Sequence, residues 1–420
     1  MAIGRCLLRK NRYNLSHILL LSFYPLTAIA HQRKYPYLCI MKIKHLTIQI
    51  IQTTNNINKV KRLQSMQKII QNGIAAVALI LSVSTASAET NAEQSSFFDE
   101  VKEKVDLSKF KPSVPKVGGL VNARYGYDTG TKFNEGGSYN GFDIRRARLS
   151  VTGDFGKSID YRIQADFAGT VKLIDAYARF KFAKELNVQV GEYKVAYSQE
   201  TLDGPTSWLT IENPTVVAKL NGYSDISGLS ANGRDVGLRL YGSFIHKEGY
   251  SVIGYKVGIY NGQGINAKDK NKYKDIEAYV TVNPIKDLTL SFANYAGRYY
   301  KDDATGTVTR NRLSTGFTYK PGKLFVRSEY LHGKTGDTKQ QGFYATAAYK
   351  LPYGLQPVLS YGYYQKDTEA KQDNQSDYTV GVNWTVNKWV RLQLDYTHTD
   401  YTASSKKNSN LVETQLLVAF

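Results

Sequence analysis

Apolar and polar residues alternate with period two along most of this chain. This alternation recurs in about sixteen short segments between Val117 and the terminal Phe420. A strand of about 9 to 11 residues that is apolar at alternate positions can cross a bilayer with one face on lipid and the other on water. The pattern therefore predicts an all-β fold, a closed transmembrane antiparallel β-barrel of about 16 strands.

The connections between these segments alternate in length. Tight turns rich in Gly, Pro or Asn alternate with longer polar loops. Short periplasmic turns and long external loops are typical of barrels in the outer membrane of Gram-negative bacteria, so we expect that location. The predicted external loops are Asp128–Gly141, Asn261–Tyr273, Lys301–Asn311, His332–Gln341, Gln365–Asp377 and Tyr401–Asn410.

One connection is much longer than the others. Lys194–Gly233 spans about 40 residues and follows the fifth predicted strand. A barrel this wide encloses an open aqueous hole unless something narrows it. We expect this loop to be the constriction, and the alternative is a lid outside the barrel. Between Val195 and Gly233 its charged residues are mostly acidic: Glu200, Asp203, Glu212 and Asp225 against the single Lys219.

The composition favours a barrel over other fold classes. Although 42% of the residues are hydrophobic, no stretch is long and apolar enough for a helical membrane protein. Of 32 tyrosines, 28 lie beyond Ala88, and tyrosine is common where strands meet the membrane surface. The alternative is a β-sandwich or solenoid with a tyrosine-rich surface. That fold needs two buried inner faces, and the polar face here is too charged.

The first 88 residues differ in composition from the rest. They contain twelve Lys and Arg residues, no Asp or Glu, and both cysteines, Cys6 and Cys39. A basic start at Met66, an apolar run and the sequence Ala86-Ser87-Ala88 predict a secretory signal peptide. The earlier apolar run Leu15–Ala30 is the alternative. The expected organisation is an over-extended N-terminus at 1–65, the signal peptide at 66–88, a periplasmic lead-in at 89–116 and the barrel at 117–420.

The charge and the cysteine count exclude several function classes. Beyond Ala88 there are 43 basic and 36 acidic residues, so the net charge of +19 falls to +7 and gives no argument for nucleic acid. The exported part would contain no cysteine, which excludes disulfides and thiolate metal sites. His246, His332 and His398 lie far apart, and no group has catalytic or metal-ligand spacing. We therefore expect no enzyme activity, no cofactor and no metal.

The alternation also predicts which side chains line the interior. If Ala147 and Leu149 face lipid, Arg146 and Arg148 face the lumen. Arg145 should then point outward, to lipopolysaccharide phosphates or the rim. The predicted channel-lining and anion-binding residues are Arg124, Arg146, Arg148, Arg162, Arg179, Lys181 and Arg239.

These basic residues have two interpretations. Guanidinium groups keep their charge and offer fixed donors, so they can replace water around a passing oxyanion. Alternatively they form an ordinary polar wall, paired with the carboxylates of Asp166, Asp175, Asp235, Glu277, Glu329 and Asp395. An acidic loop facing this wall predicts a field across the pore and broad passage of small hydrophilic solutes.

Three further stretches are informative, namely Phe142–Leu149, Val190–Glu200 and Lys256–Gly262. They resemble the phosphate-selective porin O/P family. The resemblance implies a trimeric sixteen-stranded pore with basic residues along the channel. It also implies that Phe420 matches the terminal residue that barrel-assembly machinery recognises.

The sequence therefore predicts a passive outer-membrane porin for small hydrophilic solutes, with a preference for phosphate or other anions. The expected partners are outer-membrane lipid and lipopolysaccharide, the barrel-assembly machinery, the solutes, and two further copies in a homotrimer. The alternative is a non-conducting structural or adhesive barrel, which would have a sealed lumen.

Overall fold

The computed structural model describes residues 112–130, 139–221, 224–229, 233–370, 374–403 and 406–420. The predicted over-extended N-terminus, the signal peptide and most of the lead-in lie outside these residues. Near the start of the described part, Ser113 N donates to Asp154 O at 2.7 Å, beside the end of the second strand. No helix in the described ranges is both long and apolar enough to cross a membrane.

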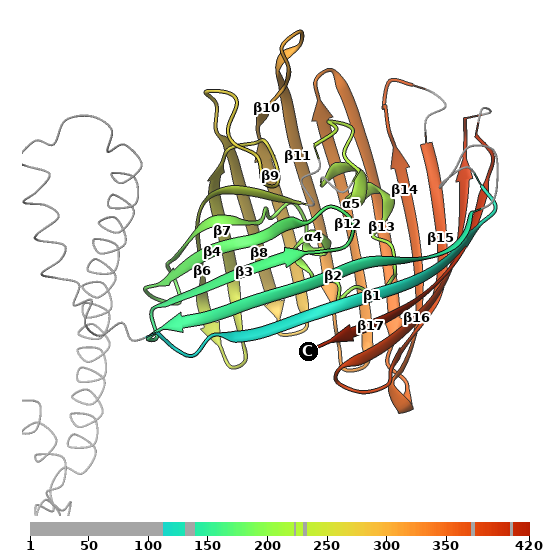
Figure 1. Ribbon diagram of the computed structural model, residues 1–420, viewed down its shortest axis with the longest axis horizontal. Helices are drawn as coiled ribbons and strands as arrows, with labels where there is room; N and C mark the ends of the chain where they lie inside the picture. Colours follow the sequence, from blue (N-terminus) through green and yellow to red (C-terminus); the bar gives the residue numbers. More distant parts are fainter. Residues whose placement is uncertain (1–111, 131–138, 222–223, 230–232, 371–373, 404–405) are drawn as a thin grey trace, which may run out of the picture. The chain divides into compact units, whose positions relative to one another are not determined.

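Sixteen strands of the described chain form a closed antiparallel ring (Figure 1). The barrel and its strand number confirm the prediction. The ring closes where the first strand pairs with both the second and the last. In its first half the strands are β1 (Lys116–Asp128), β2 (Tyr139–Phe155), β3 (Ile159–Asp166), β4 (Lys172–Lys181), β5 (Asn187–Lys194), β6 (Arg234–Lys247), β7 (Tyr250–Tyr260) and β8 (Asp275–Ile285).

The second half of the ring has equally regular pairing. Its strands are β9 (Leu288–Ala296), β11 (Gly306–Tyr319), β12 (Leu324–Thr335), β13 (Thr338–Tyr349), β14 (Leu355–Gln365), β15 (Asn374–Thr385), β16 (Val390–Tyr401) and β17 (Ser409–Ala419). A short 3-10 turn, Pro352–Gly354, joins β13 to β14. One further strand, β10 (Arg298–Asp302), pairs with β11 above the ring.

Side chains alternate between the two faces of the wall. Polar side chains point into the barrel and apolar side chains point outward, the reverse of the arrangement in a soluble protein. On β1, Asn122 and Arg124 are buried inside while Val121 is exposed outside. Exposed aromatic residues also mark the end of the barrel that has the short turns, where Trp384 Nε1 donates to Tyr353 O at 3.2 Å and Trp389 lies nearby. An apolar outer face with interfacial aromatics fits a lipid surround.

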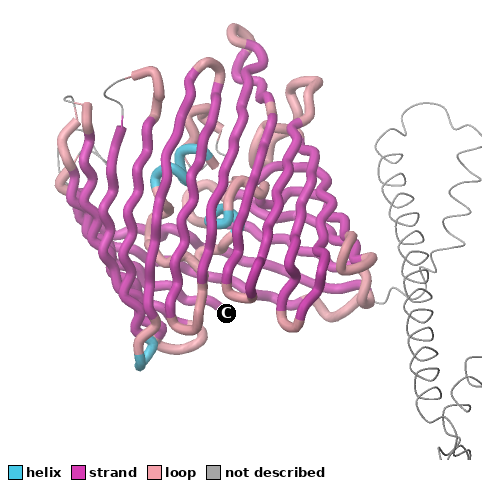
Figure 2. Tube along the Cα trace, turned by 180° about the vertical axis from the view of Figure 1, so that it is seen from behind, coloured by secondary structure: helices cyan, strands magenta, loops and turns pink. Residues whose placement is uncertain are grey.

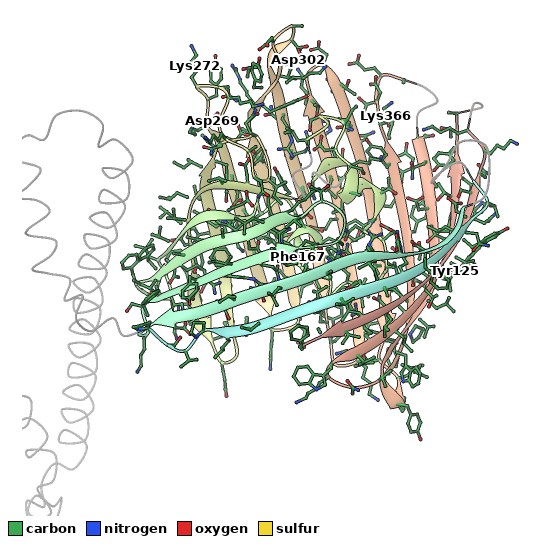
Figure 3. The ribbon with its side chains drawn as sticks, viewed as in Figure 1. Tyr125, Phe167, Asp269, Lys272, Asp302 and Lys366 are labelled. Carbon is green, nitrogen blue, oxygen red and sulfur yellow. The ribbon has the colours of Figure 1, made fainter. Side chains whose placement is uncertain are left out.

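The two ends of the barrel differ. Short turns lie at the end where the chain finishes, and longer connections lie at the other end (Figure 2). Asp269, Lys272, Asp302 and Lys366 all lie at the long-loop end (Figure 3).

Two predicted external loops are wrong. The expected loop Lys301–Asn311 is mostly strand, because β10 and β11 form a hairpin that extends above the ring and turns at Gly306, φ 71°. The expected loop His332–Gln341 is also a tight hairpin, since β12 and β13 stay paired up to Thr335 and Thr338. Gly336, with φ 60°, adopts the left-handed conformation that this turn requires.

Candidate functional site

The long connection between β5 and β6, residues 195–233, is the constriction loop of this barrel. It contains two short helices, α4 (Gln199–Leu202) and α5 (Thr215–Leu220), and Figure 1 shows both within the ring of strands. Its backbone bonds to inner side chains of distant strands. Ala196 N donates to Glu277 at 2.8 Å, and Ile211 N donates to Asp395 at 2.7 Å. The loop therefore lies inside the barrel, against the wall, rather than over its mouth.

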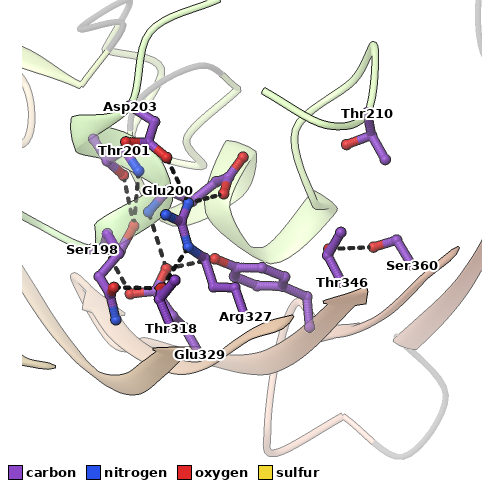
Figure 4. A network of polar contacts seen from close by, with 12 residues as sticks. Ser198, Glu200, Thr201, Asp203, Thr210, Thr318, Arg327, Glu329, Thr346 and Ser360 are labelled. Atoms are coloured by element: carbon purple, nitrogen blue, oxygen red, sulfur yellow. Dashed lines mark hydrogen bonds and ion pairs between the residues drawn. The ribbon is translucent and has the colours of Figure 1, made fainter. Parts of the chain in front are cut away.

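Helix α4 is fixed to β12 by a buried carboxylate. Glu329 accepts the backbone N–H of Gln199 at 2.7 Å and that of Glu200 at 3.1 Å (Figure 4). The hydroxyl of Tyr344 donates to the same carboxylate at 2.6 Å. Helix N-terminal N–H groups have no partner within the helix, so Glu329 and the cap residue Ser198 satisfy them here.

Helix α5 is held by apolar packing. Val216, Val217 and Leu220 are buried against Leu331, Tyr344 and Tyr364 of β12, β13 and β14. This cluster is a small core inside an otherwise polar lumen. It fixes helix α5 against β12, β13 and β14.

The acidic residues of the loop contact arginines that hold the loop in place. Glu200 and Asp203 both accept from Arg327 Nη1, at 2.5 and 2.9 Å. Asp225 accepts from Arg312 at 2.7 Å and lies 3.4 Å from Arg310. Burial opposes ionisation of Asp225, yet Arg312 and Arg310 hold its pKa below the usual value. Burial raises the pKa of Glu200, and Arg327 opposes that rise.

Glu212 contacts the opposite wall. Arg124 donates to Glu212 at 2.6 Å, to Glu413 at 2.8 Å and also to Asp143, so three carboxylates surround this predicted anion-binding residue. Lys219, on α5, lines a cavity on the β14–β17 side. The loop acids are thus paired with wall cations, and they do not face a row of unpaired arginines across the pore.

The prediction that Arg145 points outward is wrong. A β-bulge between Asn122 and Ala123 pairs these residues with Arg146 and Ile144, which leaves Arg145 as the extra residue of β2. The bulge turns its side chain inward, where Arg145 Nη2 donates to Glu212 at 2.6 Å. Two consecutive arginines, 145 and 146, therefore share the inner face.

The other predicted basic residues lie on the inner face of β2, β3, β4 and β6, most with a carboxylate partner. Arg148 contacts Asp166 at 2.8 Å, and Arg162 lies 3.6 Å from Asp175. Arg146 stacks over Trp208 of the loop, with its guanidinium 4.7 Å from the ring centroid.

The remaining predicted residues are also paired. Arg179 and Lys181 both contact Asp160, each at 2.6 Å. Arg239 is buried and makes two bonds to Glu277, at 2.9 and 2.7 Å. Of the carboxylates predicted as partners, Asp166, Asp175 and Glu277 pair with cations, whereas Asp235, Glu329 and Asp395 accept backbone N–H groups.

Two open spaces border the β2–β6 side of the lumen and share Arg148. The larger has a volume of about 540 Å³ and lies between this wall and Leu202, Gly204, Pro205 and Thr206 of the loop. Its charged lining residues are Arg148, Arg162, Arg179, Lys194, Arg234, Arg239 and Asp175. The smaller, about 270 Å³, has the charged lining residues Arg145, Arg146, Arg148, Lys172 and Asp166. Together nine different cations and two carboxylates line these spaces.

Several further cations shape this interior and are not among the predicted lining residues. Arg310, Arg312 and Arg327 hold the loop, Arg234 contacts Asp175 at 2.9 Å, and Arg391 bonds to loop carbonyls. Arg310 and Arg312 share the two-residue spacing of Arg146 and Arg148, which was the available signal. The expected loop Lys301–Asn311 contains Arg310, so this spacing did not predict an inner face there.

A family model describing phosphate-selective porin O and P matches residues 116–420, which is the whole barrel. The chain belongs to this family of porins. A curated relative from Aquifex aeolicus (strain VF5), an uncharacterized protein, is 23% identical and covers 68% of this chain and 82% of its own length.

Solved outer-membrane proteins share the fold. The channel DcaP of Acinetobacter baumannii matches with a TM-score of 0.57 at 13% identity, over 73% of this chain and 97% of that one. OmpF of Salmonella typhi, solved with daunomycin, gives 0.56 at 13% identity, over 73% and 97%. The trimer form of OmpT from Vibrio cholerae gives 0.52 at 12% identity, over 73% and 100%. Family membership, together with this shared fold, makes the protein an outer-membrane porin channel that crosses the membrane many times. No group of metal-ligating side chains occurs in the described part of this porin.

Proposed function

We propose that this porin is a passive diffusion channel for small hydrophilic solutes and that it prefers anions, small oxyanions such as phosphate among them. The observation that carries the proposal is the charge of the two spaces along β2–β6, where nine cations and two carboxylates form the lining. Cations along a narrow aqueous path raise the local concentration of anions and lower that of cations.

The pairing of the loop acids supports the same preference. Glu200, Asp203 and Asp225 contact Arg327, Arg312 and Arg310, on β11 and β12 away from these spaces. The loop segment that borders the larger space, Gly204–Thr206, carries no charge. Along the larger space, cations therefore face an uncharged loop segment, whereas Glu212 contacts Arg124 and Arg145 beside the smaller space.

Several carboxylates reduce the positive charge of the wall but do not cancel it. Asp175 lies near both Arg162 and Arg234, and Asp160 contacts both Arg179 and Lys181. At Asp175, two cations for one carboxylate leave a positive excess, whereas at Asp160 a second carboxylate, that of Asp154, lies 3.9 Å from Lys181. The side chains of Arg162 and Arg179 are also more than a third exposed, so a passing solute can reach them.

Reversal potential in planar bilayers tests the preference. The purified protein is reconstituted in a KCl gradient, with and without added phosphate. We expect a reversal potential of the sign given by chloride permeation, and a chloride current that phosphate reduces. A large conductance without selectivity would leave a general porin. The absence of any conductance would favour the non-conducting structural barrel.

We also propose that the porin assembles as a homotrimer in a lipopolysaccharide-containing membrane. The apolar outer face of the barrel and the trimer form of OmpT support this assembly. Light scattering of the detergent-solubilised protein tests it, and a monomeric mass would contradict it.

We further propose that residues 66–88 are removed on export, so that N-terminal sequencing of the outer-membrane form would begin at Glu89.

A further inference from the structure

The part of the constriction loop that faces the basic wall is a short uncharged segment, the loop tip, Gly204–Thr206. Together with Leu202 it forms the loop side of the 540 Å³ space, opposite Arg148, Arg162 and Arg179. This space is the passage that the proposed function uses, and the inference about its width rests on that function.

Wall cations hold the loop tip from several sides. Lys194 of β5 donates to Asp203 O, directly before the tip. From β16, Arg391 donates to Pro205 O at 3.0 Å and to Thr206 O at 2.9 Å. The fourth carbonyl in this row, Gly204 O, accepts from the backbone N–H of Ser207 at 2.9 Å. Four consecutive carbonyls thus have partners within the protein, and this fixes the position of the tip.

Trp208 follows the tip and is almost completely buried. The charged groups of Arg146 and Lys194 lie 4.7 and 5.8 Å from the centroid of its ring. Asp203, on the other side of the tip, is held by Arg327 of β12. The tip is therefore attached to β5, β12 and β16, and a solute cannot push it aside without breaking several charge-assisted bonds.

Gly204 has no conformational reason to be glycine. Its φ is not positive, unlike the twelve glycines of the described chain that do adopt positive φ. It has no packing reason either, because a Cβ at this position would have no heavy atom within 4 Å. Gly237 and Gly316 differ, since a Cβ there would come within 2.1 and 2.4 Å of backbone oxygens. At Gly204 the missing side chain leaves only open space.

We infer that Gly204 sets the size limit of the passage, because any side chain at this position would enter the space between the fixed tip and the basic wall. Charge on the wall would then select the sign of the solute, and the absence of a side chain at 204 would decide how large a solute can pass.

Cysteine labelling tests this inference, since both native cysteines, Cys6 and Cys39, lie before the barrel. Gly204→Cys in the full chain is treated with neutral methanethiosulfonates carrying methyl, propyl and benzyl groups, which add size without charge. The unsubstituted chain gives the background. The matched control is Ala304→Cys, an exposed position in the external β10–β11 turn. Mass spectrometry measures labelling, and heat-modifiable migration confirms folding. Thr206→Cys, also exposed at the tip, replaces Gly204→Cys if that variant does not fold.

We expect single-channel conductance to fall stepwise with adduct size at position 204, by about twofold or more for benzyl, and to stay constant at position 304. Full labelling with unchanged conductance would overturn the inference. A Gly204→Cys variant that does not react, while the Ala304→Cys variant does, would overturn it too, since position 204 would then be closed. A stepwise block in a channel that shows no anion preference would support the size limit while contradicting the proposed selectivity.

Discussion

The buried carboxylate of Glu329 accepts the backbone N–H groups at the start of helix α4, with Gln199 N only 2.7 Å away. These residues are 130 positions apart in the chain, and their contact ties the constriction loop to the opposite wall. The loop therefore forms an inner layer that is bonded to the barrel wall. We expect these bonds to keep the channel at a fixed width.

Glu329→Gln should loosen this attachment. A glutamine offers one acceptor oxygen in place of two, so one buried N–H of α4 loses its partner, at a cost of about 1–3 kcal/mol. We expect a larger and noisier single-channel conductance in bilayers. Tyr344→Phe is the control, because it removes a donor to Glu329 and leaves both loop bonds in place. Equal conductance in Glu329→Gln and the native porin would contradict the role of this contact.

Because of the ion pairs of Asp225, the loop should stay attached to the wall down to a defined acidic pH and loosen below it. Arg312 and Arg310 hold the pKa of Asp225 below the usual 3.8 despite burial. A carboxylate with a lowered pKa contributes stability above its unfolded pKa and loses that contribution as the pH falls through the folded value. The loop should therefore stay attached at pH 5 and loosen only below pH 3.8.

Conductance measured between pH 7 and pH 3 tests this limit. The native porin should show a rise below pH 3.8, whereas Asp225→Asn should already be altered at pH 7 and lack that rise. Breaking a buried pair from one side costs about 3–5 kcal/mol, so the variant should also unfold at lower denaturant. The control Glu369→Gln removes an exposed carboxylate and should follow the native curve. A rise that persists in Asp225→Asn would assign it to another group.

Period-two alternation predicted the wall of this porin because it is a local property of each strand. Arg146 and Arg148 needed only their neighbours to be placed inside. Arg145 was misplaced because a β-bulge shifts the register by one residue, and a one-residue shift reverses the face of a side chain. No periodicity in the sequence marks that shift.

The partners of the loop acids could not be predicted in the same way. Asp225 and Arg310 are 85 residues apart, and their contact depends on where α5 packs inside the closed ring. The charge and the length of the loop can be read from the chain, but pairing through space decides whether that charge faces the channel. Here Glu200, Asp203 and Asp225 contact the arginines of β11 and β12. Glu212 contacts Arg124 and Arg145, and the uncharged tip faces the basic wall.

Removing one cation from the wall should shift ion selectivity without disturbing its neighbours. Arg162 is only loosely associated with Asp175, at 3.6 Å, and Asp175 keeps Arg234 at 2.9 Å when Arg162 is lost. Arg162→Gln should therefore lower the ratio of chloride to potassium permeability, by about twofold or more if one exposed charge contributes about 0.5–1 kcal/mol. Lys272→Gln, at the long-loop end, removes the same charge far from the passage and should leave the reversal potential unchanged. Equal shifts in both variants would mean that overall charge, not the lining, sets selectivity.

The terminal residue should matter for assembly more than for the stability of the finished barrel. Phe420 continues the pairing of β17 with β1, since its N–H and carbonyl each bond to Gly119 at 3.0 Å, but its side chain is 61% exposed. Replacing that side chain in Phe420→Ser keeps both backbone bonds. We expect refolding into detergent micelles at close to the native yield, together with a strong loss of heat-modifiable barrel in the outer-membrane fraction of cells. The conservative Phe420→Tyr should restore assembly. A variant that fails equally in micelles and in cells would contradict this. The phenyl group of Phe420 would then be needed to close the barrel, and not for recognition by the assembly machinery.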